Sequence, residues 1–597
     1  MKRETPMRLA AEKQFTTHDG TELFYRHWPA EEGAGTEANK AIVLFHRGHE
    51  HSGRLQHVVD ELNLPDFACF AWDARGHGKS PGARGDSPSF AASVKDMDVF
   101  LRHVSEAYDI PMRNIVVLAQ SVGAVLASTW AHDYAPRVRG LVLVAPAFKV
   151  KLYVPLARPA LALWYKLRGN FFITSYVKAK FLTHDPERIA SYDADPLITR
   201  DISARILLGL YDAAERVIAD AQAIRLPIQV LASDSDWVVH PEPQEEFYRR
   251  AGSKVKEFHV LPGFFHDILG EKERYLALDK VRSFIKNLFK VPPEGLLPDD
   301  DLLQAHRTGY TRDEEEQLKS PLPALSLKSL QFALTRLSMK TLGRLSAGIR
   351  LGLETGFDSG STLDYVYLDQ ARGELGLGKF IDRSYLDAVG WRGIRVRKQH
   401  LGQAITAAAR SLKVAARPVH ILDIAAGHGR YVLDALATLP GQPDSILLRD
   451  YSPANVEAGR ALIDWRGLAR GARFEAGDAF DQTGLAALAM AQHRPNISIV
   501  SGLYELFPDN DLVSRSLSGL AQAVEEGGYL IYTGQPWHPQ LEMIARTLTS
   551  HRDHQPWIMR RRTQAEMDAL VAHAGFRKLE QWTDEWGIFT VSLAQRI

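Results

Sequence analysis

The sequence predicts an α/β protein with two domains joined end to end, and three observations support this fold class. The chain has 597 residues, well beyond the roughly 250–300 at which a single hydrophobic core stops growing. Apolar runs typical of buried parallel strands alternate with helical patterns in both halves. Each half also has its own turn motif at a strand end, a serine in the first and a glycine-rich segment in the second. We therefore expect two domains, each with its own site.

Composition and charge are those of an ordinary globular protein. Hydrophobic residues make up 45% of the chain, and 72 basic residues balance 72 acidic ones. No domain is strongly basic and no recognition motif occurs, so no nucleic-acid partner is expected. The one cysteine, Cys69, lies in an apolar run and is interpreted as core. No metal site is predicted, and nothing indicates an oligomeric state.

The start of the chain and its apolar runs bear on localisation. Met1 to Phe15 has no continuous apolar core, so it does not resemble a secretory signal. No uncharged apolar run reaches the length of about 18 residues that a bilayer span needs. We expect a cytoplasmic protein, in contact with the inner face of the membrane only at its surface.

Changes in composition place the domain boundaries. The first domain is expected at 1–290, with an inserted cap at about 148–226. A linker at 291–325 begins with Val291-Pro-Pro-Glu-Gly295, which breaks the pattern. A helical, partly basic segment is expected at 326–389 and the second domain at 390–597.

A serine occupies the turn after the third expected strand of the first domain. The strands are expected at 41–45, 67–72 and 114–119. Ser121 follows them between Ala119 and Gly123, and a helical pattern begins at Ala124. Small neighbours are required because the turn that exposes such a nucleophile is sharp. Alone, the pattern fits an ordinary strand-to-helix turn equally well.

Chain order strengthens the interpretation of Ser121 as a nucleophile. Asp236 follows an expected strand at 228–232, and His266 follows another at 258–261. Enzymes with this serine turn carry the order Ser, Asp, His along the chain. We expect His266 to take the Ser121 proton and return it to the leaving group, while Asp236 fixes the tautomer of His266. Asp234 is the alternative carboxylate.

At these residues the chain resembles the monoacylglycerol lipase and lysophospholipase branch of the α/β-hydrolase fold, over about 15–288. The segments that carry the resemblance are 46–54, 73–82 and 185–197. The resemblance implies that the backbone N–H groups of Gly48 and Val122 form the oxyanion hole. Arg47 and His49 stand where this branch usually has glycines, which places bulk and charge beside that hole. Substrate range, or activity itself, is therefore open.

The cap and the segment after the linker suggest contact with lipids. The cap is rich in aromatic and aliphatic residues, which suits an acyl chain, although packing of the lid explains many of them. Between 326 and 352, leucines recur at helical spacing among Lys328, Arg336, Lys340 and Arg344. Such a basic amphipathic helix either docks on its own protein or lies on an anionic membrane.

The second domain begins with a strand, a glycine turn and a helix. The strand is expected at 419–423, and Gly427 and Gly429 allow backbone N–H groups to approach a ligand at the following helix. A dinucleotide fold would have a third glycine where this chain has Val432. The next two strands end in Asp450 and Asp478. These acids suit ribose hydroxyls and an adenine amine.

This succession resembles the class I S-adenosylmethionine-dependent methyltransferases, which have a Rossmann-like fold, over about 390–597. Asp423, Gly427 and Gly429 match their first motif, and Asp450 and Asp478 their second and third strand ends. The resemblance implies S-adenosyl-L-methionine as cofactor. A fourth strand at 497–501 precedes the region where such enzymes contact substrate. Candidates for contact with the methyl acceptor are Tyr504, Glu505, Trp537 and His538.

Taken together, these features predict a bifunctional enzyme, a serine ester hydrolase fused to a methyltransferase, acting on lipid or lipid-like substrates. The full chain is similar to a bacterial group of such fusions. One alternative keeps the hydrolase fold as a catalytically silent lipid-binding module, since Arg47 lies beside the oxyanion hole. A second alternative is a lipid-binding scaffold that has neither activity. The acyl chain and the methyl acceptor are not indicated by the sequence.

Overall fold

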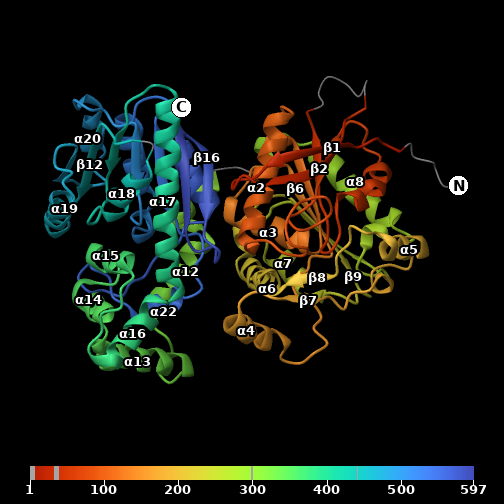
Figure 1. The fold of residues 1–597 in the computed structure, drawn as a ribbon, viewed down its shortest axis with the longest axis horizontal. Coiled ribbons are helices and arrows are strands. Elements are labelled where there is room, and N and C mark those ends of the chain that lie inside the picture. Colours follow the sequence, from red (N-terminus) through yellow and green to blue (C-terminus); the bar gives the residue numbers. More distant parts are fainter. Residues whose placement is uncertain (1–6, 32–38, 297–299, 440) are drawn as a thin grey trace. The chain divides into compact units, whose positions relative to one another are not determined.

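The computed structural model describes residues 7–31, 39–296, 300–439 and 441–597. The chain divides into two compact units, Met1–Pro298 and Asp299–Ile597. Each unit has its own sheet with helices on both faces (Figure 1). The α/β class and the two folds predicted from the sequence are confirmed.

The sheet of unit 1 has the strand order β1-β2-β4-β3-β5-β6-β9-β10. From β4 to β10 neighbouring strands are parallel, whereas β1 and β2 pair antiparallel at one edge. The strands are β1 (Ala11–Thr16), β2 (Glu22–Trp28), β3 (Ala41–Phe45), β4 (Ala68–Trp72), β5 (Ile115–Gln120), β6 (Gly140–Val144), β9 (Ile228–Ser233) and β10 (Lys256–Leu261). The carboxyl ends of the parallel strands meet at one edge, where a site is expected.

Apolar side chains that alternate along each strand build two cores in unit 1. Val43 and Phe45 pack on one face and Ile42 and Leu44 on the other. The first face is covered by α2 (Phe90–Ala107), α3 (Val122–Tyr134), α6 (Ala204–Ala219) and α7 (Glu242–Arg250). The second face is covered by α1 (Gln56–Leu62) and α8 (Tyr275–Leu288).

The cap lies between β6 and β9 in the chain. It contains α4 (Ala157–Arg168), β7 (Phe172–Thr174), α5 (Pro186–Ala194) and β8 (Asp201–Ser203), with α6 at its end. β7 and β8 form a small antiparallel pair of their own. Every side chain of α4 is exposed or half-buried, including Leu163, Trp164 and Leu167. This helix therefore contributes little to the core of unit 1.

The sheet of unit 2 has the order β13-β12-β11-β14-β15-β17-β16. Its strands are β11 (His420–Asp423), β12 (Ser445–Asp450), β13 (Ala472–Ala476), β14 (Ile497–Val500), β15 (Tyr529–Gly534), β16 (Phe576–Thr583) and β17 (Thr590–Arg596). The strands from β13 to β15 are parallel, and β17 runs antiparallel to both β15 and β16. This antiparallel end separates the sheet from the all-parallel dinucleotide fold.

Helices cover both faces of this sheet. One face is covered by α17 (Val389–Val414), α18 (Arg430–Ala435) and α19 (Pro453–Trp465). The other is covered by α20 (Gln482–Ala486), α21 (Asn510–Ala523) and α23 (Gln564–His573). The short α22 (Leu541–Thr547) packs in a separate cluster with Leu318 and Met559.

The segment expected to be a linker is largely helical. It contains α9 (Pro293–Leu296), α10 (Asp300–Leu303), α11 (Ala305–Thr308) and α12 (Tyr310–Lys319). In α12, Thr311, Glu315 and Leu318 are buried. This part of the chain therefore belongs to the packed body of unit 2 from α10 onward.

The basic segment was predicted as one helix over 326–352, and that prediction is wrong. It forms α13 (Leu327–Lys340), a 3-10 turn η6 (Leu342–Leu345) and α14 (Ala347–Thr355), followed by α15 (Gly360–Leu368) and α16 (Leu375–Leu386). Thr341 leaves the helical conformation, with φ −108° and ψ −94°. The Ser346 hydroxyl then accepts from the Ile349 N–H and starts α14 as a new helix.

Leucines and basic side chains share the exposed surface of α13. Phe332 is buried and Met339 half-buried, whereas the leucines at 327, 330, 334 and 337 are exposed. Among the helices that the structure describes, none has the length and hydropathy needed to cross a bilayer.

Candidate functional site

Ser121 lies at the strained turn between β5 and α3. Its backbone has φ 53° and ψ −113°, a conformation that L-residues rarely adopt. A side chain at position 123 would not fit, because a Cβ on Gly123 would lie 2.6 Å from the carbonyl oxygen of His46. The small residue predicted after the serine is therefore required by a close backbone approach.

Ser121, His266 and Asp236 form a connected triad. His266 Nε2 lies 2.8 Å from Ser121 Oγ, and His266 Nδ1 lies 2.8 Å from Asp236 Oδ2. All three side chains are buried. With its proton on Nδ1, facing the carboxylate, His266 presents Nε2 as the acceptor for the serine proton.

Asp236 is held by the backbone as well as by His266. Its Oδ1 accepts from the N–H groups of Val238 and Val239, at 2.7 and 3.0 Å. Burial raises the pKa of Asp236, but His266 and these two N–H groups outweigh burial and leave the pKa below its ordinary value. Asp234, the alternative carboxylate, is exposed and accepts from the Gly263 N–H. The structure thus brings Asp236 to the histidine.

The predicted oxyanion-hole residues lie against each other. A Cβ on Gly48 would lie 3.1 Å from Val122 Cγ2. Val122 is the first residue of α3, so its N–H has no acceptor within the helix. These two backbone segments frame the position beside Ser121 where a carbonyl oxygen would be bound.

The side chain of Arg47 forms ion pairs within the protein. Its Nη2 lies 2.7 Å from Glu50 Oε1 and 3.3 Å from Asp267 Oδ2. Burial works against the charged form of Arg47, but these two carboxylates outweigh it and raise the pKa of Arg47. The charge that the sequence placed beside the oxyanion hole is therefore balanced by two acids.

His49 adopts the left-handed backbone that a glycine would tolerate better, with φ 72°. It is half-buried, and burial, followed by the charge of Arg47, lowers the pKa of His49 to about 4. The imidazole is therefore neutral at neutral pH. The departures from glycine at 47 and 49 thus add bulk to this region without a free charge.

A largely apolar cavity of about 260 Å³ opens onto Ser121 and His266. Cap residues make up most of its wall, among them Leu152, Leu161, Ile173, Tyr176, Leu210 and Tyr211. Its floor includes Gly48 and Val122. Part of the apolar content of the cap therefore lines the space in front of the nucleophile, whereas Tyr153, Trp164 and Phe172 are exposed and do not line it.

In unit 2, the glycine turn connects β11 to α18. Gly427 and Gly429 both have positive φ, 57° and 75°. A Cβ on Gly429 would lie 2.5 Å from Leu448 Cδ1, so the turn requires glycine there. Asp423, at the end of β11, accepts from the Tyr431 hydroxyl and from the Ala425 N–H. Burial outweighs these two hydrogen bonds and raises the pKa of Asp423 to about 7.

The acids at the next two strand ends differ in how many bonds they make. Asp450 Oδ2 accepts from the Gly427 N–H at 2.9 Å, and Oδ1 accepts from Ser452 and Asn455. A carboxylate has about four acceptor positions, so Asp450 can receive one more hydrogen bond. Asp478 is exposed, and its Oδ1 accepts from the Phe480 N–H.

The three strands β11, β12 and β13 are neighbours, so their terminal acids follow one edge of the sheet. Two glycines in this turn, together with carboxylates that retain acceptor capacity, fit a nucleoside that donates from a ribose hydroxyl and from an amine. The start of α15 lies above this turn: the Cα of Gly360 is 3.7 Å from the position of a Cβ on Gly427. The start of α15 is therefore in van der Waals reach of the glycine turn.

A second apolar cavity, of about 350 Å³, lies in unit 2. Glu505 and His538, two of the four predicted acceptor contacts, line it. The other two do not. Tyr504 is core, 2% exposed, with its hydroxyl donating to Ser516 Oγ, and Trp537 is half-buried beneath the guanidinium of Arg561.

Sequence reasoning missed further polar residues of this cavity. Arg397 projects from α17 and Gln535 directly follows β15. Gln535 had the same signal as Asp450, a polar side chain just after a buried strand. Arg397 had none, because it lies inside a long helix with many other basic residues. The Arg560-Arg-Arg562 run is buried and paired with Glu566, Glu314 and backbone carbonyls, so it is structural.

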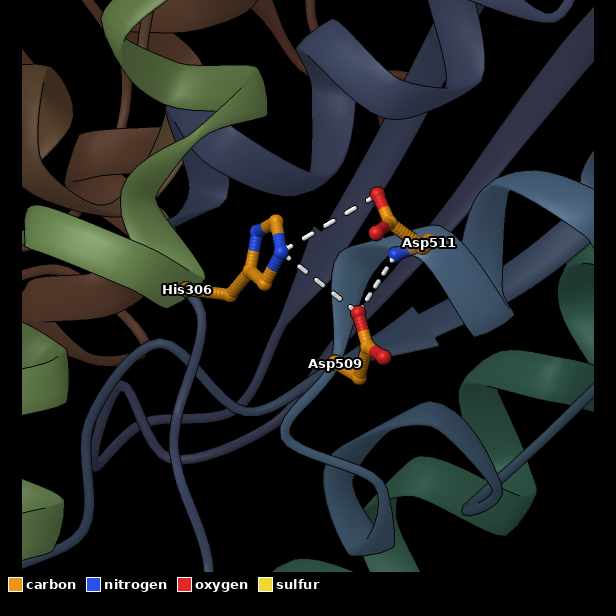
Figure 2. A group of neighbouring side chains, drawn as sticks. All are labelled: His306, Asp509 and Asp511. Atoms are coloured by element: carbon orange, nitrogen blue, oxygen red, sulfur yellow. Dashed lines mark hydrogen bonds and ion pairs between the residues drawn. The ribbon is translucent and has the colours of Figure 1, made fainter.

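One group of side chains has ligand types that suit a cation (Figure 2). His306 Nε2 lies 3.5 Å from Asp509 Oδ1 and 3.9 Å from Asp511 Oδ1. The guanidinium of Arg307 donates to His306 Nε2 at 3.2 Å and pairs with Asp511 at 2.8 Å. A cationic side chain of the protein therefore already occupies this group, and we assign no metal to it.

Two family models match the chain. The model described as "Putative methyltransferase" matches residues 281–596, which is more than half of the chain. The model described as "Serine aminopeptidase, S33" matches residues 36–273. The two matches fall on the two sheets described above.

Similar proteins extend over the whole chain or over unit 1. The "Uncharacterized protein YnbC" of Escherichia coli is 57% identical over 589 residues, covering 99% of both chains. The monoacylglycerol lipase of Mycolicibacterium smegmatis is 27% identical over 279 residues, 46% of this chain and 96% of the lipase. A solved soluble variant of monoglyceride lipase from Saccharomyces cerevisiae, 19% identical, aligns with a TM-score of 0.43 over 48% of this chain and 98% of its own.

Proposed function

We propose that this chain is a bifunctional enzyme, because it belongs to the "Putative methyltransferase" family and also contains a monoglyceride-lipase-like hydrolase domain. Unit 1 hydrolyses esters with apolar acyl groups, and unit 2 transfers a methyl group from S-adenosylmethionine. The observation that carries the first part is the triad geometry, with both contacts of His266 at 2.8 Å, in front of an apolar cavity.

Ester hydrolysis follows from the positions of these side chains. Ser121 Oγ attacks the ester carbonyl while its proton passes to His266 Nε2. The N–H groups of Gly48 and Val122 stabilise the negative oxygen of the tetrahedral intermediate. His266 then gives the proton to the departing alcohol. Water hydrolyses the acyl-serine by the same steps, which releases the carboxylic acid and restores Ser121.

The cavity favours an acyl chain over a charged or peptide substrate. The residues in front of Ser121 are mostly aliphatic and aromatic, and Arg47 is paired with Glu50 and Asp267. An apolar chain gains free energy by leaving water for such a surface, at about 25 cal/mol per Å². The names of relatives of unit 1, monoacylglycerol and monoglyceride lipases, support the same class of ester.

Turnover of monoacylglycerols and of p-nitrophenyl esters of increasing acyl length tests this part. The purified full chain is expected to hydrolyse the longer esters and to react with a fluorophosphonate probe, and Ser121→Ala is expected to abolish both. If the wild-type chain takes no probe and turns over no ester, unit 1 is a silent binding module.

The methyltransferase part rests on the glycine turn and its strand-end acids. Asp450, which already accepts from the Gly427 N–H, would accept from a ribose hydroxyl and Asp478 from the adenine amine, and the glycines at 427 and 429 would let the ligand approach the backbone. When bound, S-adenosylmethionine supplies an activated methyl group as a sulfonium. Calorimetry of the full chain with S-adenosylmethionine is expected to show binding that Asp450→Ala weakens. No heat of binding would refute this part.

We also infer that the chain acts at an anionic lipid surface on the cytoplasmic side. Five leucines on α13 and η6 are exposed, at 327, 330, 334, 337 and 342. The exposed cations Lys340 and Arg344 lie beside them in the chain. Apolar side chains flanked by cations are the features of a helix that lies in the headgroup region of a membrane.

A further inference from the structure

The 350 Å³ cavity of unit 2 is apolar along most of its wall and polar at one end. Its apolar part includes Met339, Trp391, Ile394, Met543, Trp557 and Phe589. These come from α13, α17, α22, the segment between α22 and α23, and the residue before β17, so the cavity lies between the helical segment and the sheet. Such a wall binds an apolar molecule of appreciable size.

The polar end contains side-chain atoms that have no hydrogen-bond partner among the residues described. They are Glu505 Oε2, Gln535 Nε2 and Arg397 Nε. The three side chains are 8%, 5% and 3% exposed. A buried polar atom without a partner is costly, and native proteins rarely keep several in one place. The absent partner is therefore expected to be a ligand with a polar head.

His538 adds a further donor to the wall of this cavity. Its Nδ1 accepts from the Gln540 N–H at 3.0 Å, which leaves the ring proton on Nε2. Burial lowers the pKa of His538 to about 4, so the ring is neutral. A Cβ on Gly390 would lie 3.0 Å from this Nε2, so the glycine leaves the nitrogen accessible.

These atoms define the head group they would bind. Glu505 Oε2 accepts, so the ligand must donate one hydrogen. Gln535 Nε2, Arg397 Nε and His538 Nε2 donate, so the ligand must also offer an oxygen lone pair. An ammonium group has no lone pair and a carboxylate has no hydrogen to donate. A hydroxyl provides both in one atom, and its two lone pairs can accept from two of these three donors.

The polar end also lies beside the cofactor turn in the sheet. Glu505 follows β14, and β14 is the direct neighbour of β11, which leads into Gly427 and Gly429. Both segments leave the carboxyl end of parallel strands. The polar head of a ligand in this cavity would therefore be held at the edge of the sheet where the methyl group is supplied.

We propose that this cavity is the methyl-acceptor site and that it takes an apolar molecule whose polar head is a hydroxyl. The inference rests on the methyltransferase function proposed for unit 2. The hydroxyl loses its proton to Glu505 Oε2, and its oxygen gains the methyl group that the sulfonium gives up, which leaves a thioether and an ether. Gln535 and His538 orient the oxygen.

Photo-crosslinking tests the site directly. Three dodecyl probes carrying a diazirine in the chain and ending in an alcohol, an amine or a carboxylic acid are irradiated with the full chain, and labelled peptides are mapped by mass spectrometry. The alcohol is expected to label peptides containing Met339, Met543 or Trp557 in preference to the amine and the acid. Because the labelled peptides are identified, labelling in this cavity is distinguished from labelling in the cavity of unit 1.

Variants then link the labelling to the polar end. Glu505→Gln is expected to lower alcohol labelling of these peptides about tenfold, the effect of losing a hydrogen bond to a charged group. Ala388→Trp and Met543→Trp are expected to block labelling by filling the cavity, whereas the exposed Leu377→Trp is the matched control. Circular dichroism identifies any variant that does not fold, and two blocking variants keep the test decisive.

The outcomes separate this inference from the function on which it rests. The acceptor site is overturned if the alcohol labels only peptides of unit 1, or if Glu505→Gln and both blocking variants leave the labelling unchanged. Either result counts whether or not the chain binds S-adenosylmethionine. A chain that binds no S-adenosylmethionine while the cavity is labelled overturns the methyltransferase proposal and leaves a hydroxyl-lipid binding site.

Discussion

His266 Nε2 lies 2.8 Å from Ser121 Oγ although the two residues are 145 positions apart in the chain. Each stands just after a strand of one parallel sheet, β5 and β10, so the fold alone brings them to the same edge. Asp236 arrives in the same way after β9.

Replacing Asp236 by asparagine should nearly abolish ester hydrolysis without unfolding unit 1. The amide cannot hold the His266 proton on Nδ1, and the corresponding change in a serine protease costs about 10⁴-fold in kcat. Initial rates on a p-nitrophenyl ester measure the effect. Asp234→Asn is the matched control and should retain nearly full activity, since Asp234 is exposed. Equal loss in both variants would mean that the triad is misassigned.

Replacing Arg47 by methionine should destabilise unit 1. Glu50 would keep only Arg54, at 3.5 Å, and Asp267 would keep Arg188, at 3.0 Å, so the cost should not exceed the about 3–5 kcal/mol of breaking a buried ion pair on one side. The urea midpoint of unit 1, followed by circular dichroism, measures the loss. Arg158→Met, on an exposed pair, should change stability by about 1 kcal/mol or less. If Arg47→Met were as stable as the wild type and more active, Arg47 would be an obstruction of the oxyanion hole.

Replacing Leu334 and Leu337 together by glutamate should release the chain from anionic vesicles. Both side chains are more than half exposed, so the core loses nothing, whereas the lipid-facing surface becomes polar and negative. Co-sedimentation with phosphatidylglycerol vesicles measures this, with phosphatidylcholine vesicles for comparison. A double substitution of the exposed Leu163 and Leu167 on α4 shows whether unit 1 binds independently. Unchanged sedimentation of the α13 variant would remove this surface from the proposal.

The residues that could be predicted from the sequence are those at strand ends. Ser121 and Gly427 lie in short motifs whose backbone geometry demands particular residues, so the pattern is visible without a structure. Partners chosen by tertiary packing were not predictable. The pairing of Arg47 with Asp267 joins distant segments, and Arg397 reaches the second cavity from the middle of a helix.

The break in the basic segment shows a different limit. Leucines on both sides of Thr341 keep helical spacing, so periodicity predicts one helix across 326–352. The 3-10 turn at Leu342–Leu345 interrupts the helix while keeping the spacing nearly intact. The close approach of Gly343 to Ile349, where a Cβ would lie 3.1 Å from Ile349 Cγ2, depends on packing that periodicity does not contain.

Asp423 makes the stability of unit 2 dependent on pH. Its folded pKa, about 7, lies above the ordinary value of 3.8 because the side chain is buried. Folding therefore favours the protonated carboxyl, and the stability of unit 2 should fall as pH rises from about 4 to about 7. Asp423→Asn should flatten that fall. Urea midpoints of unfolding, measured across this pH range, test the prediction. The Asp568→Asn variant, which removes a carboxylate outside the glycine turn, is the control.

The same group predicts how cofactor binding depends on pH. S-adenosylmethionine bound at the glycine turn would bring positive charge toward Asp423, which would favour the charged carboxylate and lower the pKa of Asp423 on binding. Binding at pH 7 should therefore release about half a proton, and the affinity should rise as pH increases through 7. Calorimetry in buffers of different ionisation enthalpy measures how many protons are released on binding. Binding to the Asp423→Asn variant should release none. Proton uptake on binding would show that the bound cofactor does not stabilise the ionised carboxylate of Asp423.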